Sequence, residues 1–299
     1  MSDQPSSPSH EQSPMKGSRF HPLWVAWVNQ PWRWVPTLTL IPVLYGLGWL
    51  VMQPVARLIP GLTISARDLM GTLVSELLFI VVLPSWVRLR WTTRQPWRQL
   101  GLSSSRQQPP RRQAFTTGLA WALGLLLVIS VISLSGRWAY WLGDLNASEV
   151  LNALLLCFGV GFAEELLFRG WLWGELTLFM DARSAFVGQA AVFSLVHTRF
   201  NLGVWPMLGL LIGLFGLGLV LGLRRRLDQG SLWGCVGLHG GLVGGWFLLH
   251  QAGLLQWSPQ TPFWLSGPGG NPLGGVVGIA AVTGLLILQL TALAKAARP

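Results

Sequence analysis

Three ionisable residues lie close together in an otherwise apolar stretch of the chain. The segment "GFAEELLFRG" at 161–170 contains Glu164, Glu165 and Arg169. In a helix, Glu165 and Arg169 are four residues apart and face the same way, whereas Glu164 points about 100° aside. The spacing predicts an ion pair between Glu165 and Arg169 that leaves Glu164 free to act as an acid or base. An ion pair with a purely structural role is the alternative, but it leaves the second glutamate unexplained.

Two histidines in later apolar segments extend this group. His197 follows Phe193 by four residues in "FSLVHTRF", and His239 lies in "GLHGGLVGG". One histidine on an apolar helix is more often an interhelical hydrogen-bond partner, and one phenylalanine is core by default. Here, however, three apolar segments each contribute a carboxylate or an imidazole. This combination predicts general acid–base chemistry, or a zinc site made by Glu164, His197 and His239. The glycines around His239 predict close helix packing: Gly237, Gly240, Gly241, Gly244 and Gly245.

The elements that position these residues are predicted to be membrane-spanning helices. Of the 299 residues, 51% are hydrophobic and only 11% are charged, which is typical of an integral membrane protein. A bilayer core of about 30 Å requires a helix of about 20 apolar residues. The chain is therefore expected to be an all-α, polytopic transmembrane bundle of about eight spans, at 36–56, 69–88, 114–135, 149–168, 185–200, 202–223, 231–250 and 274–294.

The net charge of +10 is interpreted as a topology signal rather than as a nucleic-acid surface. Seven arginines lie between 88 and 112, and three more at 224–226, all at even-numbered span ends, whereas the loop 251–273 at an odd-numbered end has no charge. This loop is expected to be a plain connector. We expect both termini on the cytoplasmic side of a bacterial plasma or internal membrane, and no nucleic-acid partner.

The chain ahead of the third span is expected to form two parts. Residues 1–22 are rich in Ser, Pro and Gln and lack the apolar region of a signal peptide, so they predict a disordered cytoplasmic tail. Residues 23–113 predict an interfacial segment, two spans and the basic loop. Cys157 and Cys235 lie in apolar spans and are expected to pack as small hydrophobic residues.

The combination of Glu164-Glu165-x-x-x-Arg169, Phe193-x-x-x-His197 and a glycine-flanked His239 resembles the CPBP family of intramembrane proteases. This family, also called the Abi family, is named for CAAX proteases and bacteriocin-processing enzymes and includes the type II CAAX prenyl endopeptidases. The motif region runs from about 149 to 245, within a protease core at 114–299. The stretch "RQPWRQLGL" at 94–102 also resembles a segment that often precedes this core.

The resemblance implies a role for each of the five polar residues. Glu164 would be the general base that activates water, His197 would help to hold that water, and His239 would stabilise the oxyanion. Glu165 and Arg169 would fix the helix that presents the base. The substrate would be a membrane-embedded or lipidated peptide or protein. Many members carry Asn four residues after the last histidine, where this chain has Val243.

Three questions stay open from the sequence. The chemistry slightly favours a metal-free glutamate mechanism over zinc, because the helix signature H-E-x-x-H is absent. A transporter or proton relay, or an inactive scaffold or immunity protein of the same fold, would also contain intramembrane Glu and His. Finally, the chosen spans put Glu164 in the cytoplasmic half of its helix and His197 in the outer half of the next, which requires a helix that begins inside the membrane or tilts strongly.

Overall fold

The structure, a computed structural model, describes residues 22–28, 34–59, 61–103 and 105–296. The predicted tail at 1–22 lies outside these residues except for Pro22, with which the first helix begins. Within these residues, the regular secondary structure is helical apart from two strands of three residues. Its α-helices and strands are α1 Pro22–Val28, α2 Trp34–Leu58, α3 Ile64–Arg90, α4 Pro96–Gln99, α5 Arg111–Ser135, β1 Ala139–Trp141, α6 Ala147–Glu165, α7 Trp173–Leu176, α8 Ala182–Leu195, α9 Val204–Leu227, α10 Trp233–Trp246, β2 Leu255–Trp257, α11 Phe263–Ser266 and α12 Val276–Ala296.

Five further helical segments lie between these elements in the described part of the chain. Two have the wider turn of a π-helix and extend α6 and α10, and three are single 3-10 turns. They are η1 Leu166–Leu172 and η3 Phe247–Gln251, which are π-helical, and η2 Phe200–Leu202, η4 Pro268–Gly270 and η5 Pro272–Gly274.

Among the described residues, six helices are long and apolar enough to cross a membrane, so the prediction of an all-helical membrane protein is confirmed, whereas the count of eight spans is not. The six are α2, α3, α5, the continuous helix Ala147–Leu176, α9 and α12. The predicted span at 185–200 instead corresponds to α8, which has 14 residues, and that at 231–250 corresponds to α10, which η3 extends to Gln251. At 1.5 Å per residue, α8 reaches about 21 Å, less than a bilayer core of about 30 Å.

Helix α10 shows that an apolar segment of this chain need not face lipid. Every residue from Gly234 to Leu242 is buried, and the helix packs against α5, α6 and α9. A helix that is apolar all round can be surrounded by protein or by lipid, and composition does not distinguish the two. In this chain, protein surrounds α10.

The glycines of α10 allow the neighbouring helices to approach its backbone. A Cβ atom at Gly240 would collide with the carbonyl oxygen of Cys157 on α6, and one at Gly237 would collide with that of Phe115 on α5. Close helix packing, as predicted from these glycines, is therefore what the structure contains. Small residues are how membrane helices reach such short separations.

The difference in depth between Glu164 and His197 disappears because the helix of Glu164 is longer than predicted. It does not end at 168 but continues through η1 and α7 to Leu176. Helix α8 then begins at Ala182 and runs back along it, capped by the Asp181 side chain, which accepts a hydrogen bond of 2.9 Å from the backbone N–H of Arg183. The turn of this helical hairpin is therefore farther from Glu164 than the sequence suggested.

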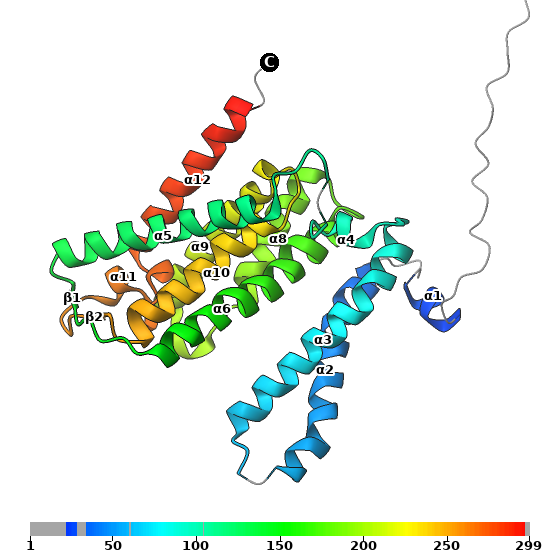
Figure 1. Cartoon of the computed structure of the whole chain (residues 1–299), viewed down its shortest axis with the longest axis horizontal. Coiled ribbons are helices and arrows are strands. Elements are labelled where there is room, and N and C mark those ends of the chain that lie inside the picture. The colour runs from blue at the N-terminus through cyan, green and yellow to red at the C-terminus, as the bar shows by residue number, and fades with distance from the viewer. Residues whose placement is uncertain (1–21, 29–33, 60, 104, 297–299) are drawn as a thin grey trace, which may run out of the picture.

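Figure 1 shows α5, α6, α8, α9 and α10 gathered into one bundle, while the α2–α3 hairpin extends away from it on one side. The short strands lie at one end of the bundle and α4 lies at the other. Strand β1 pairs with β2 in antiparallel register, with Ala139 opposite Trp257 and Trp141 opposite Leu255. This pairing ties the loop after α5 to the loop after α10.

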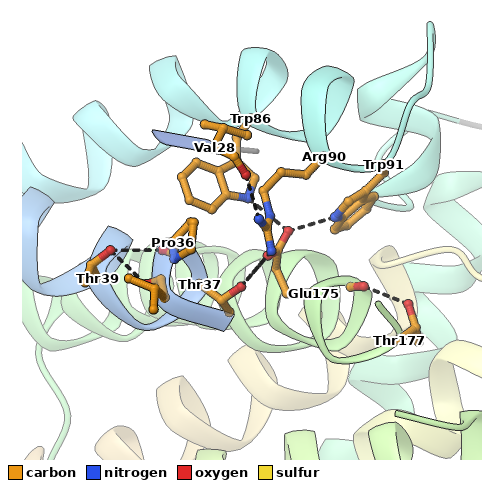
Figure 2. Close-up of polar contacts among 11 residues, drawn as sticks. Val28, Pro36, Thr37, Thr39, Trp86, Arg90, Trp91, Glu175 and Thr177 are labelled. Atoms are coloured by element: carbon orange, nitrogen blue, oxygen red, sulfur yellow. Dashed lines mark hydrogen bonds and ion pairs between the residues drawn. The ribbon is translucent and has the colours of Figure 1, made fainter. Parts of the chain in front are cut away.

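A buried carboxylate attaches the α2–α3 hairpin to the bundle. Figure 2 shows four side chains directed at Glu175 of α7, which is fully buried. Thr37 of α2 donates to it at 2.6 Å, and Trp86 and Arg90 of α3 donate at 2.9 and 2.8 Å. The indole N–H of Trp91 donates at 2.8 Å. The carboxylate thus links two helices near the beginning of the chain to the end of the long helix that carries Glu164.

Glu175→Ala is expected to loosen this attachment. The substitution leaves the buried Arg90 guanidinium without its anion, and removing one partner of a buried ion pair typically costs about 3–5 kcal/mol. The free energy of unfolding in detergent should fall by that order, and protease cleavage within 34–90 should become faster. Asp68→Asn, which alters an exposed carboxylate on α3, is the control. Equal stability of the two variants would contradict the proposed attachment.

Candidate active site

Glu165 lies at the centre of the site as the anion of a buried ion pair. Glu165 and Arg169 are both fully buried, and Arg169 Nε donates to Glu165 Oε2 at 2.7 Å. A second bond joins Arg169 Nη2 to Glu165 Oε1. The ion pair predicted from the four-residue spacing forms even though the helix changes from an α-helix to a π-helix after Glu165. Isolated π-helical turns of this kind occur frequently at functional sites.

The same carboxylate also orients His239 of α10. The distance from His239 Nδ1 to Glu165 Oε1 is 2.7 Å, and because a carboxylate can only accept, the imidazole donates from Nδ1. This hydrogen bond sets the plane of the ring and places Nε2 on the opposite side, toward Glu164. The sequence predicted that Glu165 pairs with Arg169, but it did not reveal that Glu165 also holds His239.

His197 is held in a similar way by a backbone carbonyl. It lies two residues after α8 ends, and its Nδ1 atom is 2.7 Å from the carbonyl oxygen of Phe193, to which it donates. The Nε2 atom, on the other side of the ring, is therefore directed away from α8. The two imidazoles are thus fixed through Nδ1 by different acceptors, and both present Nε2.

Both Nε2 atoms face one carboxylate oxygen of Glu164. Glu164 Oε2 lies 3.7 Å from His197 Nε2 and 3.9 Å from His239 Nε2. These distances exceed a direct hydrogen bond but suit a small molecule held between the three groups. Within the part of the chain that the structure describes, Glu164 Oε2 is buried without a hydrogen-bond partner. A buried polar atom of this kind requires a partner, which a substrate or a water molecule would supply.

The three groups open into a cavity of about 280 Å³ with mostly apolar walls. Phe193 lies between the imidazoles, with its ring centroid 4.9 Å from that of His197 and 5.6 Å from that of His239. The guanidinium of Arg169 lies over this ring, 4.3 Å from its centroid. Phe193 is fully buried, as a core residue would be, but it also separates the ion pair from the cavity. Val243 is part of the cavity wall.

The zinc alternative requires Glu164, His197 and His239 to bind one ion. Glu164, His197 and His239 surround one point, but no three His, Cys, Asp or Glu side chains form a group with the spacing of a metal site in residues 22–28, 34–59, 61–103 and 105–296. The chemistry assigned to these residues therefore contains no step through a metal, and metal dependence is a question for experiment.

Sequence reasoning did not single out two further polar residues, Glu76 and Arg225. Glu76, in the middle of α3, has an unpartnered buried oxygen, and its charge interacts with that of Glu164. A glutamate inside an apolar span is itself a signal of function, and it would have identified Glu76. Arg225 of α9 donates to the carbonyl oxygen of Arg169 and, at 3.1 Å, to that of Gln99. Only tertiary structure brings Arg225 to the π-helical segment.

Comparison with known families matches two segments of the chain, one of which contains this site. The type II CAAX prenyl endopeptidase Rce1-like family matches residues 146–244. This segment is an Rce1-like domain. The Rce1-like domain contains all five polar residues identified from the sequence, so the resemblance to the CPBP family is confirmed for this part of the chain. A second family, a domain of unknown function (DUF8676), matches residues 15–95 and so includes Glu76. No curated protein and no solved structure matched the chain.

Adjacent glutamates of the Rce1-like domain should respond differently to the same substitution. Glu165→Gln removes the anion between Arg169 and His239 and should lower the free energy of unfolding by about 3–5 kcal/mol, because a buried guanidinium loses its counter-charge. Glu164→Gln, the matched control, removes a carboxylate that forms no hydrogen bond at its buried oxygen and should leave stability nearly unchanged. Denaturant unfolding in detergent measures both. An equal loss in the two variants would contradict this division between a structural and a free glutamate.

Proposed function

We propose that the protein is an intramembrane endopeptidase that hydrolyses a peptide bond of a membrane-embedded or lipidated protein or peptide. The observation that carries this proposal is the convergence of His197 Nε2 and His239 Nε2 on the unpartnered Glu164 Oε2. The three groups come from different elements and meet in a small cavity within the Rce1-like domain. A carboxylate and two oriented imidazoles in a mostly apolar cavity are suited to activate water.

In the proposed reaction, a water molecule lies between Glu164 Oε2 and the two imidazoles. Glu164 takes a proton from this water while the water oxygen bonds to the scissile carbonyl carbon, and the carbonyl oxygen becomes negatively charged. The carbon–nitrogen bond then breaks, and the proton on Glu164 passes to the departing nitrogen. The products are a carboxylic acid and an amine, so one water molecule is consumed for each bond that is cleaved.

The surrounding residues act by holding these groups in place. Glu165 keeps His239 in the orientation in which Nε2 faces the reaction, and the Phe193 carbonyl does the same for His197. We propose that His197 helps to hold the water and that His239 stabilises the oxyanion. Arg169 compensates the charge of Glu165, so that the buried carboxylate stays available as an acceptor. We favour a metal-free reaction.

The apolar helices indicate an integral membrane protein, and its orientation is a proposal. An even number of crossings, six or eight, leaves both termini on one side. The arginines at 88–112 lie on that side in either case and favour the cytoplasmic side for both termini, in a bacterial plasma or internal membrane. The arginines at 224–226 lie on that side only if eight helices cross. No feature of the described structure favours ion transport over hydrolysis, because Glu164, His197 and His239 form one cluster at one cavity rather than a row.

The proposal predicts that Glu164→Gln abolishes cleavage while the protein remains folded. Loss of the base should lower the rate by about 10²–10⁴-fold, the usual contribution of a positioned proton acceptor. The measurement is cleavage of a library of membrane-embedded and lipidated peptides in nanodiscs, by wild type and Glu164→Gln, each with and without a zinc chelator. Chelator-resistant activity would support metal-free chemistry, and chelator-sensitive activity would establish a metal.

Other outcomes of this measurement separate the rival functions. Equal cleavage by wild type and Glu164→Gln would eliminate Glu164 as the base. Absence of cleavage by the wild type across the library would favour an inactive scaffold or a transporter. Ion flux in proteoliposomes that depends on Glu164 would then identify the transporter.

A further inference from the structure

The segment 267–275, "GPGGNPLGG", is not the plain connector that the sequence suggested. It follows α11 and contains the 3-10 turns η4 and η5. Gly267, Pro272, Gly274 and Gly275 are buried although the segment contains no helix longer than one turn. A buried segment without regular structure must satisfy its backbone polar groups locally, and it does so partly through bonds such as that from Gly274 N–H to the carbonyl oxygen of Asn271 at 3.1 Å.

The segment packs directly on the backbones of α9 and α12. A Cβ atom at Gly213 of α9 would collide with the carbonyl oxygen of Leu273, and one at Gly278 of α12 would collide with that of Pro272. Gly209 of α9 has no room for a Cβ atom either, because that atom would lie 2.6 Å from the carbonyl oxygen of Gly274. In a membrane protein, irregular backbone of this kind is tolerated where it is buried in protein or lines a cavity. This segment does both.

Asn271 is the residue with a polar side chain that this segment contributes to the cavity wall. It lines the same cavity as Glu164, His197 and His239. Its Oδ1 atom accepts a hydrogen bond of 3.1 Å from the backbone N–H of Leu273, which fixes the amide plane. The amide nitrogen therefore remains as the donor of this side chain. It donates to no protein acceptor among the described residues.

The cavity offers few other neutral donors for a developing negative charge. Beyond the three proposed reacting groups, the polar side chains on its wall are Arg199, Trp246 and Asn271. Arg199 is exposed, and the ring of Trp246 contacts that of His250 in a tilted arrangement, with a centroid separation of 3.9 Å. Val243, also on the wall, has no donor. Peptide hydrolysis places negative charge on the carbonyl oxygen, and preoriented donors toward that oxygen accelerate the reaction.

We propose that the Asn271 side chain is a further catalytic residue, whose amide nitrogen donates a hydrogen bond to the scissile carbonyl oxygen of the substrate. This assignment rests on the proposed peptidase function. It places one reacting-site residue outside the segment that matches the Rce1-like family, which ends at 244. The cavity wall formed by 267–275 then both confines the substrate and supplies a donor to it.

Asn271→Asp tests the assignment because it changes the donor and keeps the fold. An aspartate oxygen can still accept from the Leu273 N–H, whereas the amide donor is lost. We expect kcat to fall by about 10²–10³-fold, as for removal of one oxyanion donor, with little change in KM or in the unfolding temperature. Asn201→Asp, which makes the same change at an exposed position outside the cavity, should retain wild-type kcat.

A second pair of variants distinguishes donation from a structural role. Asn271→Ala removes both the donor and the acceptor, and adding Val243→Asn returns an amide to the cavity from the wall of α10. The double variant should have a kcat at least about tenfold above that of Asn271→Ala, because one restored oxyanion donor is typically worth that much or more. Both variants carry the same change at 271, so this gain would come from the amide at 243 and not from repair of the loop.

Three outcomes would overturn the assignment. If the wild type cleaves its substrate and Asn271→Asp keeps the full kcat, the catalytic role of Asn271 is overturned, while the proposed peptidase function stands. A loss of activity that follows a lower unfolding temperature, without rescue by Val243→Asn, would reduce Asn271 to a cap of its loop. Absence of wild-type cleavage would overturn the peptidase function, and this assignment with it.

Discussion

The site depends on one buried carboxylate that serves two partners. Glu165 is fully buried, and an unpaired anion there would be strongly unfavourable. Arg169 compensates its charge, and His239 donates to the oxygen that this pair also uses. The interaction that makes the buried charge tolerable therefore also fixes an imidazole of the site. Glu164, one residue earlier, points to a different side of the helix and stays free to face that imidazole.

Close helix packing makes this arrangement possible. His239 reaches Glu165 because α10 lies against α6 at glycines, where Gly240 meets the backbone of Cys157. Larger residues at these positions would hold the two helices farther apart. His239 would then lie too far from Glu165 to form the hydrogen bond of 2.7 Å. The same device places the irregular segment 267–275 against α9. Glycine thus determines the shape of the site without contributing a functional group to it.

The N-terminal hairpin belongs to the same structural unit as the Rce1-like domain. Glu175 binds side chains from α2 and α3 and lies on the continuation of the helix that presents Glu164. Glu76 of α3 adds a second carboxylate whose charge interacts with Glu164. The segment matched by the domain of unknown function therefore meets the long helix at its end. This contact connects the N-terminal region to the helix that carries the proposed base.

The sequence by itself determined the local features of this protein. The spacing of Glu165 and Arg169 predicted their ion pair, and apolar length predicted six of the helices, because helix geometry and bilayer thickness act over short stretches of chain. Tertiary structure alone decided that His239 binds Glu165, that Asn271 lines the cavity, and that protein encloses α10. These features depend on which distant segments pack together, and hydropathy records only that a segment avoids water, not whether protein or lipid replaces it.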